Sequence, residues 1–296
     1  MKAFVALVHR EFLEHRGAFL IAPMVLVALV FGPAILALIF GRLDAHFSGM
    51  MLSAAPMRVY ETGFLAFGFG WGLYLLGTLF FYCADGFSAD RRNNAMLFWK
   101  SMPVSDFKIL LAKFTATLTI FPGLIYLAAL VSGLLFMLMA IATAAFSGGN
   151  VGQLASGIAG AYGQIALSNL VTLAVGLLWY MPFIALVGAL AVVVGRWAIP
   201  LSLLLPAIVS VLEWAVLGGL HPFATHVWRY ISGRVDFRVG EGYVENWLTA
   251  AEPFSFTAYA THLIAHTGWV QVLIGAVFAL AALYLASEYR RRVNDN

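Results

Sequence analysis

The chain has 296 residues, of which 62% are hydrophobic and only 10% are charged, and its mean hydropathy is +0.90. Soluble domains are about 45–50% apolar and about 25% charged, so this composition excludes a water-soluble globule. Disorder is excluded as well, because disordered chains are poor in hydrophobic residues. The single cysteine, Cys83, excludes an internal disulfide, and a net charge of +3 gives no reason to expect nucleic acid as a partner.

Residues 1–16 predict an amphipathic helix that lies on the membrane surface. Phe4, Val5, Val8 and Phe12 share a stripe, whereas the basic side chains lie mostly elsewhere, although Glu11 and His15 intrude on the stripe. This pattern is typical of interfacial helices. The alternative is a polar lead-in to the first membrane span.

The rest of the chain predicts an all-α integral membrane protein with a single transmembrane domain over residues 1–296. A membrane-spanning helix needs about 20 apolar residues. The apolar runs predict six spans, at about 17–41, 62–84, 109–141, 161–195, 198–217 and 266–287. In the second span, the spacing of Gly68 and Gly72 predicts close packing against another helix.

Two of these runs exceed 30 residues and contain proline, which leaves eight spans as the competing count. The third run is expected to break near Pro122–Gly123, and the fourth carries Pro182. A small-residue loop is predicted over 147–157, and a mixed extracytoplasmic segment over 218–265.

Basic residues decide the orientation, because they concentrate in cytoplasmic connections. With six spans, 12 of the 17 Lys and Arg residues fall on the side that holds both termini, and five fall on the other side. We therefore expect a multi-pass protein of a bacterial-type cytoplasmic membrane with both termini in the cytoplasm.

Motifs of common enzymes are missing from the sequence. It contains no GxxxxGK[ST] phosphate loop, no HExxH and no GxSxG, so it holds no Walker-type ATP site of its own. We expect a protein that is not an enzyme and that carries no cofactor. Any chemical energy would come from a partner or from an ion gradient.

The connection over 87–104 carries the strongest functional pattern. Ser88 is expected to cap a short helix at 89–100, which Pro103 ends, and Ser105 or Asp106 would cap the helix that follows. The first half of the short helix is charged and the second half is apolar, through Asp90, Arg91, Arg92, Leu97, Phe98 and Trp99. The pattern suits docking of a cytoplasmic protein, or anchoring of the aromatic rings among lipid headgroups.

This architecture and this connection resemble the permease subunits of ABC-2 type ABC exporters. In that family the connection often has an acidic residue and Arg, then an apolar run, then a small residue, Pro, Val and Ser, with a Lys further on. This chain has Asp90, Arg91, Arg92, Leu97, Ser101–Ser105 and Lys113 in those places. It has Asn93–Asn94 where the family commonly has Gly–Thr.

The resemblance implies a dimer of permeases, homodimeric or heterodimeric, that binds two copies of a separate ABC ATPase. ATP and Mg would bind to that partner. Segment 87–104 would hold the coupling helix, and 218–265 would form an external cap with short re-entrant helices. The expected cargo of such an exporter, given the apolar and aromatic spans, is amphipathic or lipid-like.

Glu213 is the candidate residue for the substrate path, because an ionisable residue inside a span is a functional candidate. It would equally carry the proton of an ion-driven secondary carrier. The alternative is that Glu213 lies near the outer interface and pairs with Arg229.

The outer-side histidines give the remaining alternative, which is a membrane metal-binding protein. His262 and His266 share a helix face, and His221 and His226 follow the fifth span. Imidazoles bind zinc or copper, but ordinary interfacial histidines explain the same pattern. A structural membrane anchor that assembles a complex through 87–104 is the last alternative.

Overall fold

The computed structural model describes residues 2–40, 56–92, 105–146, 151–218, 221, 225–235, 240–249 and 252–295. These residues form helices and short connections, and none of them lies in a strand. Six helical stretches are long and apolar enough to cross a membrane: Ala3–Ile39, Met57–Ala89, Asp106–Ala145, Val151–Val194, Ala198–Leu217 and Trp269–Arg292. The expectation of a six-span, all-α membrane protein is confirmed at this level.

The helices follow one another with short connections. They are α1 (Lys2–Arg16), a π-helical turn (Gly17–Ile21), α2 (Ala22–Ile39), α4 (Pro56–Arg92), α6 (Asp106–Leu118), α7 (Ile120–Phe146), α8 (Val151–Val194), a 3₁₀ turn (Gly195–Trp197), α9 (Ala198–Leu217), α10 (His226–Val235), α11 (Glu241–Thr249), α12 (Phe256–His266) and α13 (Trp269–Asp295).

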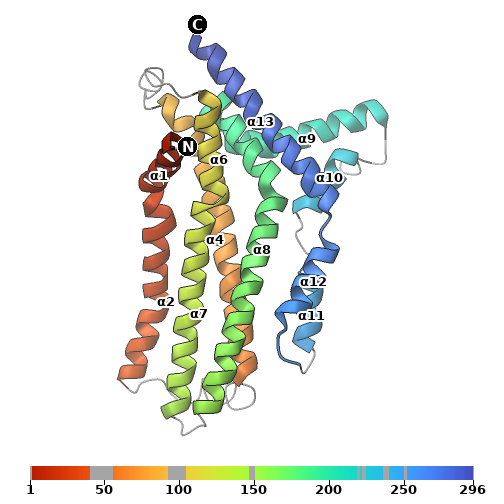
Figure 1. Ribbon diagram of the computed structural model, residues 1–296. Coiled ribbons are helices and arrows are strands. Elements are labelled where there is room, and N and C mark those ends of the chain that lie inside the picture. The colour runs from red at the N-terminus through yellow and green to blue at the C-terminus, as the bar shows by residue number, and fades with distance from the viewer. Residues whose placement is uncertain are drawn as a thin grey trace.

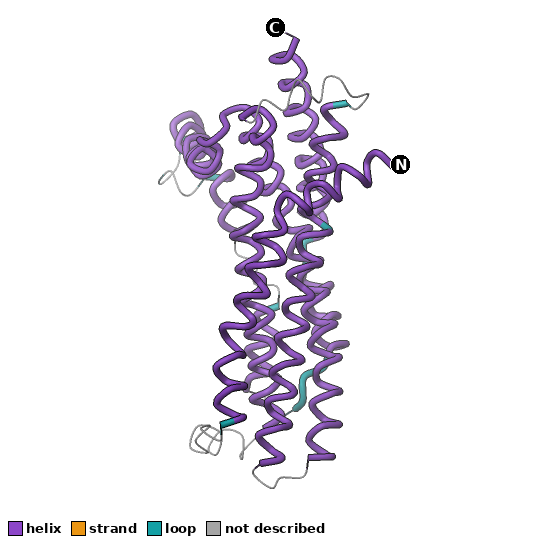
Figure 2. Tube along the Cα trace, turned by 90° about the vertical axis from the view of Figure 1, so that its left-hand side faces the viewer, coloured by secondary structure: helices purple, strands orange, loops and turns teal. Residues whose placement is uncertain are grey.

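Helices α2, α4, α7 and α8 lie side by side in a long bundle, and both chain termini lie at the same end of it (Figures 1 and 2). We call this the terminal end. Two clusters of buried apolar side chains hold the bundle together. One includes Leu79, Phe121 and Leu283, and the other includes Phe64, Ile165 and Leu263.

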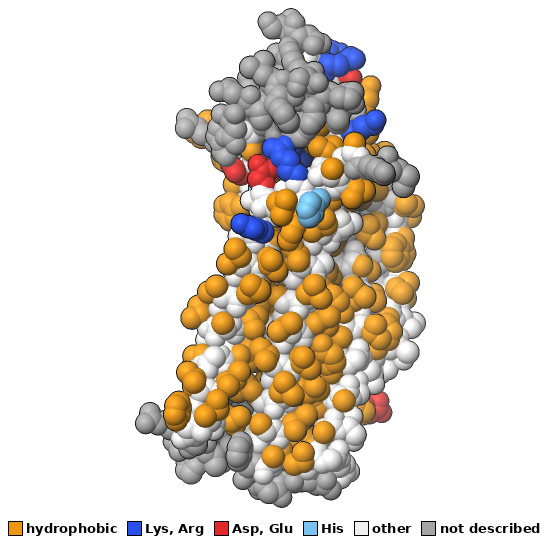
Figure 3. All heavy atoms as spheres, turned by 60° about the vertical axis from the view of Figure 1, so that its left-hand side comes forward, with side chains coloured by type: hydrophobic (Ala, Val, Ile, Leu, Met, Phe, Trp, Pro, Cys, Tyr) orange, Lys and Arg blue, Asp and Glu red, His pale blue; other side chains and the backbone are white. Residues whose placement is uncertain are grey.

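The outer face of the bundle is apolar. Figure 3 shows hydrophobic side chains along the length of one face, with Lys, Arg and most acidic side chains near the terminal end. Large exposed apolar residues include Val30, Leu138 and Val277, which are 55%, 52% and 69% exposed. Such a surface is stable when the surrounding medium is hydrocarbon rather than water.

The third apolar run consists of α6 and α7, which continue in the same direction with a break between them and do not fold back. The break lies at Thr119, which has φ −125° and ψ −69° and ends α6. It comes three residues before the expected position at Pro122–Gly123. A proline disturbs the preceding turn, because its ring clashes with the carbonyl four residues earlier, which here belongs to Leu118.

The fourth run is the single helix α8, which continues through Pro182. Its 44 residues make it about 66 Å long at 1.5 Å per residue, roughly twice the hydrocarbon thickness of a bilayer. The helix already begins at Val151, so much of the small-residue loop expected over 147–157 is helical. The two long runs therefore support six spans rather than eight.

Helix α9 covers the predicted fifth span, but it does not run along the bundle. Figure 1 shows it crossing the terminal end, and Figure 2 shows it nearly end on. The chain turns at Gly195, whose φ of 58° favours glycine. The turn is completed by the 3₁₀ residues Gly195–Trp197. The length of the apolar run predicts a helix here, but it does not predict the direction in which that helix runs.

Segment 218–265 contains helices α10 and α11 and most of α12 in its described part. Helix α10 packs against α9, and α12 packs against α8. Figure 1 shows α11 and α12 nearer the end of the bundle opposite the termini. The side of the membrane on which this segment lies stays a prediction.

Candidate functional site

A buried ion pair joins the N-terminal helix to the bundle. Glu11 of α1 and Lys113 of α6 are 4% and 3% exposed, and the Lys113 Nζ lies 3.0 Å from the Glu11 Oε1. Lys113 also donates a hydrogen bond to the carbonyl of Gly86 in α4 at 3.0 Å. A single ammonium group therefore contacts α1 and α4 from α6.

Tyr82 of α4 completes this charged cluster, which we call the Glu11 cluster (Glu11, Tyr82, Lys113). Its hydroxyl donates to the Glu11 Oε2 at 2.8 Å. The ring of His15 lies edge-on to the Tyr82 ring, with centroids 4.6 Å apart. Both carboxylate oxygens of Glu11 are thus occupied, which a buried carboxylate requires.

A second ion pair ties the start of α6 to the last helix. The Arg290 Nε of α13 lies 2.7 Å from the Asp106 Oδ1, and Arg290 is 4% exposed. Asp106 lies in the first turn of α6, where Ser105 caps the helix by accepting from the backbone N–H of Lys108. This confirms the helix start expected at Ser105 or Asp106.

The two ion pairs flank the predicted docking connection. Helix α4 leads into residues 93–104, and α6 begins directly after them. Of the predicted docking residues, Asp90, Arg91 and Arg92 belong to the last turn of α4. Leu97, Phe98, Trp99 and Pro103 lie outside the described residues.

One expectation for this connection is wrong. Ser88 does not begin a new helix, because α4 continues through Arg92. The Ser88 hydroxyl donates to the carbonyls of Ala84 and Asp85 at 3.2 and 3.0 Å. Serine inside a helix can also bond to the carbonyl of the preceding turn, so its side chain alone did not fix a helix start.

Glu213 of α9 is not among the buried charges. Its two carboxylate oxygens accept hydrogen bonds from the backbone N–H groups of His226 and Val227, at 2.9 and 3.0 Å. These groups are at the N-terminus of α10, where a negative charge is favourable. Glu213 therefore fastens α9 to α10.

The predicted histidine group is only partly brought together. The rings of His262 and His266 stack with centroids 4.1 Å apart. His221 is exposed, and His226 starts α10. Among the described residues, a group of three potential ligand atoms within 4.8 Å forms at Glu11, Glu14 and His15 instead. There the Glu11 carboxylate is already bound to Lys113 and Tyr82.

Arg234 is a buried charge that sequence reasoning missed. It is 1% exposed, and its guanidinium lies over the Trp179 ring, 5.0 Å from the centroid. Its donors reach the carbonyls of Trp179 and Gln271 and the Tyr230 hydroxyl, at 3.2, 2.8 and 3.0 Å. No carboxylate pairs with it in the described part of the chain.

A further group of contacts fastens α11 and α12 to the start of α4. Arg58 donates to the carbonyls of Trp247 and Glu252, and its guanidinium lies 4.1 Å from the centroid of the Trp247 ring. Glu61, which is 2% exposed, accepts from the backbone N–H of Phe254 at 3.0 Å. Arg58 and Glu61 therefore hold the segment of α11 and α12 against α4.

Comparisons with known proteins add no identification. A scan against protein-family models, a search of curated proteins and a search of solved structures each found no match. The function has to be argued from the residues and contacts described above.

Proposed function

We propose that the chain is the permease subunit of an ATP-driven exporter similar to the ABC-2 type. In this proposal it pairs with a second permease copy and with two copies of a separate ABC ATPase, which binds ATP and Mg. The chain itself catalyses no reaction. It crosses a bacterial-type cytoplasmic membrane, with both termini and residues 93–104 on the cytoplasmic side.

The observation that carries this proposal is the arrangement of buried charges around the predicted docking connection. Lys113 joins α6 to Glu11 of α1 and to Gly86 near the end of α4. Asp106 joins the first turn of α6 to Arg290 of α13. Four helices are thus linked at the point where the chain leaves for residues 93–104 and returns.

Such links suit the transmission of a mechanical displacement. Leaving one charge of a buried ion pair without its partner costs about 3–5 kcal/mol. The linked helix ends should therefore move together rather than separate. Closure of an ATPase dimer against residues 93–104 would displace the end of α4 and the start of α6. Lys113 would pass this displacement to α1, and Asp106 would pass it to α13.

The cargo of the proposed exporter is amphipathic or lipid-like. The surfaces of α2, α7 and α13 are apolar over the length of their spans, and no described span presents a row of free charges. A small hydrophilic solute would lose its hydration in such surroundings without gaining hydrogen bonds.

The test is affinity purification of the chain from its native membrane in a mild detergent, followed by mass spectrometry. The expected partner is an ATPase with a Walker motif. Charge reversal with Arg91→Glu and Arg92→Glu should abolish its recovery. The matched control reverses a second arginine pair at the same end, Arg291→Glu and Arg292→Glu, which is exposed on α13 and should leave recovery unchanged.

Two outcomes would contradict the proposal. One is recovery of the chain without any ATPase, under conditions in which a known ABC transporter stays assembled. The other is equal loss of the ATPase in both charge-reversed variants. A secondary carrier, in contrast, would lose transport in Glu213→Gln. The proposed exporter should keep transport, because the Glu213 carboxylate accepts hydrogen bonds from the backbone of α10.

A further inference from the structure

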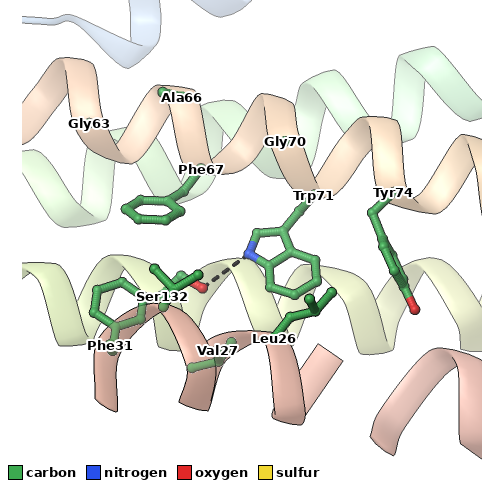
Figure 4. Close-up of a pocket in the computed structure, with 11 residues that line it drawn as sticks. Leu26, Val27, Phe31, Gly63, Ala66, Phe67, Gly70, Trp71, Tyr74 and Ser132 are labelled. Atoms are coloured by element: carbon green, nitrogen blue, oxygen red, sulfur yellow. Dashed lines mark hydrogen bonds between the residues drawn. The ribbon is translucent and has the colours of Figure 1, made fainter. Parts of the chain in front are cut away.

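A pocket lies between three of the spanning helices, away from the charged contacts described above. Its volume is about 500 Å³, which is within the range of about 300–1,000 Å³ typical of small-molecule sites. Figure 4 shows Phe67 and Trp71 reaching from α4 toward α2 and α7. The other lining residues are Leu26, Val27, Val30, Phe31, Gly63, Ala66, Gly70, Tyr74 and Ser132.

The polar groups of the pocket are already satisfied by the protein. Trp71 Nε1 donates to the Ser132 hydroxyl at 3.0 Å, and that hydroxyl donates to the carbonyl of Ala128 at 2.8 Å. The Tyr74 hydroxyl donates to the carbonyl of Ala18 at 2.6 Å. No donor of these side chains is left for a ligand, so a polar headgroup would lose its hydration without compensation.

The shape of the pocket follows the helices. Ala66 and Gly70 leave one face of α4 without bulk, and a Cβ added at Gly70 would meet no atom within 4 Å. The α4 residues from Gly63 to Tyr74 that line it cover about 16 Å along the helix axis at 1.5 Å per residue. The pocket is therefore elongated along α4, the direction in which lipid chains run in a bilayer.

The mouth of the pocket faces the surroundings of the bundle. Leu26 and Val30 of α2 are 39% and 55% exposed, and Ala66 and Gly70 of α4 are exposed as well. All four lie inside helical stretches that are apolar enough to cross a membrane. The medium at this mouth is bilayer hydrocarbon rather than water.

We propose that this pocket holds one acyl chain of a bilayer phospholipid, whose headgroup stays outside at the membrane surface. The satisfied polar groups, the elongated apolar lining and the exposed mouth at span depth together select a hydrocarbon chain. The acyl chain fills the pocket, whose lining residues would otherwise have no contacts on one side. The site does not depend on the proposed exporter function, because it needs only a surrounding bilayer.

The test uses phosphatidylcholine with a photoactivatable diazirine on one acyl chain. The protein is reconstituted in vesicles that contain this lipid, extracted, washed in lipid-free detergent to remove loosely held lipid, and then irradiated. Peptide mass spectrometry locates the adducts. We expect them on the pocket residues of α2, α4 and α7, and not on the exposed face of α13, where Val277 is 69% exposed.

The variant Gly70→Leu should fill the pocket from within and lower the yield of these adducts by about tenfold or more. The matched control is Gly72→Leu, since a Cβ at Gly72 also meets nothing within 4 Å but Gly72 does not line the pocket. Thermal unfolding of both variants checks that they fold. The proposal is overturned by absent adducts after washing, by adducts spread equally over α13, or by equal yields from two folded variants.

Discussion

Removal of the buried ammonium group of Lys113 should loosen the terminal end of the bundle. In Lys113→Met, Glu11 keeps its charge and its buried position but loses the cation 3.0 Å away. Such an uncompensated buried charge costs about 3–5 kcal/mol. At about 1.4 kcal/mol per factor of ten, opening of this region should become roughly two to three and a half orders of magnitude more frequent.

The chain carries its own reporter for this measurement. Cys83 is the only cysteine, is fully buried, and directly follows Tyr82, which donates to Glu11. The rate at which a thiol reagent labels Cys83 in detergent therefore reports the opening of this region. The expected result is labelling of Lys113→Met that is faster by the factor given above.

Two comparisons separate the ion pair from general damage. The triple variant Glu11→Met, Tyr82→Phe, Lys113→Met replaces the whole Glu11 cluster by apolar groups, which is often neutral or stabilising, and should label nearly as slowly as the original protein. Arg291→Met breaks an exposed pair with Glu288 and should change little. Labelling of Lys113→Met at the original rate, or a triple variant faster than Lys113→Met, would refute the reasoning.

Two further substitutions test the contacts of Arg234 and Arg58. Gly275→Ala should destabilise the protein by about 1–3 kcal/mol, because the added methyl group would collide with the Arg234 guanidinium. In the control Gly233→Ala the methyl group meets no atom within 4 Å, so the midpoint of thermal unfolding should not fall. Equal effects of the two substitutions would contradict this prediction. Arg58→Met should increase proteolytic cleavage between α11 and α12, because the hydrogen bonds to Trp247 and Glu252 are lost. Cleavage at the original rate would show that these contacts do not hold the segment.

The sequence predicted the number of apolar helices because length and hydropathy are local properties of the chain. Ser105 was recognisable as a cap because serine is favoured at helix starts and Ser105 stands directly before an apolar run. Gly68 was expected at a helix contact, and it lies against Asn169 of α8, whereas Gly72 has open space around it. The small-residue spacing alone did not distinguish these two glycines.

The charged contacts of the site were not predictable because they join residues far apart in the chain. Helices α2 and α4 lie between Glu11 and Lys113 in the chain, and each of the two residues looks like an ordinary polar residue near a span end. The signal that existed was the intrusion of Glu11 into the apolar stripe of residues 1–16. A charge on the buried face of a helix needs a partner, but the pattern does not identify that partner.

Arg234 gave no comparable signal. It lies in a mixed segment that contains other arginines and aromatic residues, which is equally typical of a surface connection. Its burial depends on where α10 lies, because Arg234 contacts Trp179 of α8 and Gln271 of α13. The position of α10 depends in part on the bonds from its first residues to Glu213. Such a chain of tertiary contacts cannot be read from residue types at one position.

The π-helical turn at Gly17–Ile21 sets the rotational phase of everything that precedes it. A turn of this kind holds one residue more than the corresponding α-helical turn, and each residue of an α-helix advances the side-chain direction by about 100°. If all of these residues wound as a regular α-helix instead, Glu11 would swing about a quarter of a circle away from Lys113. The π-helical turn therefore decides which side of α1 faces the bundle, although it changes no residue of α1.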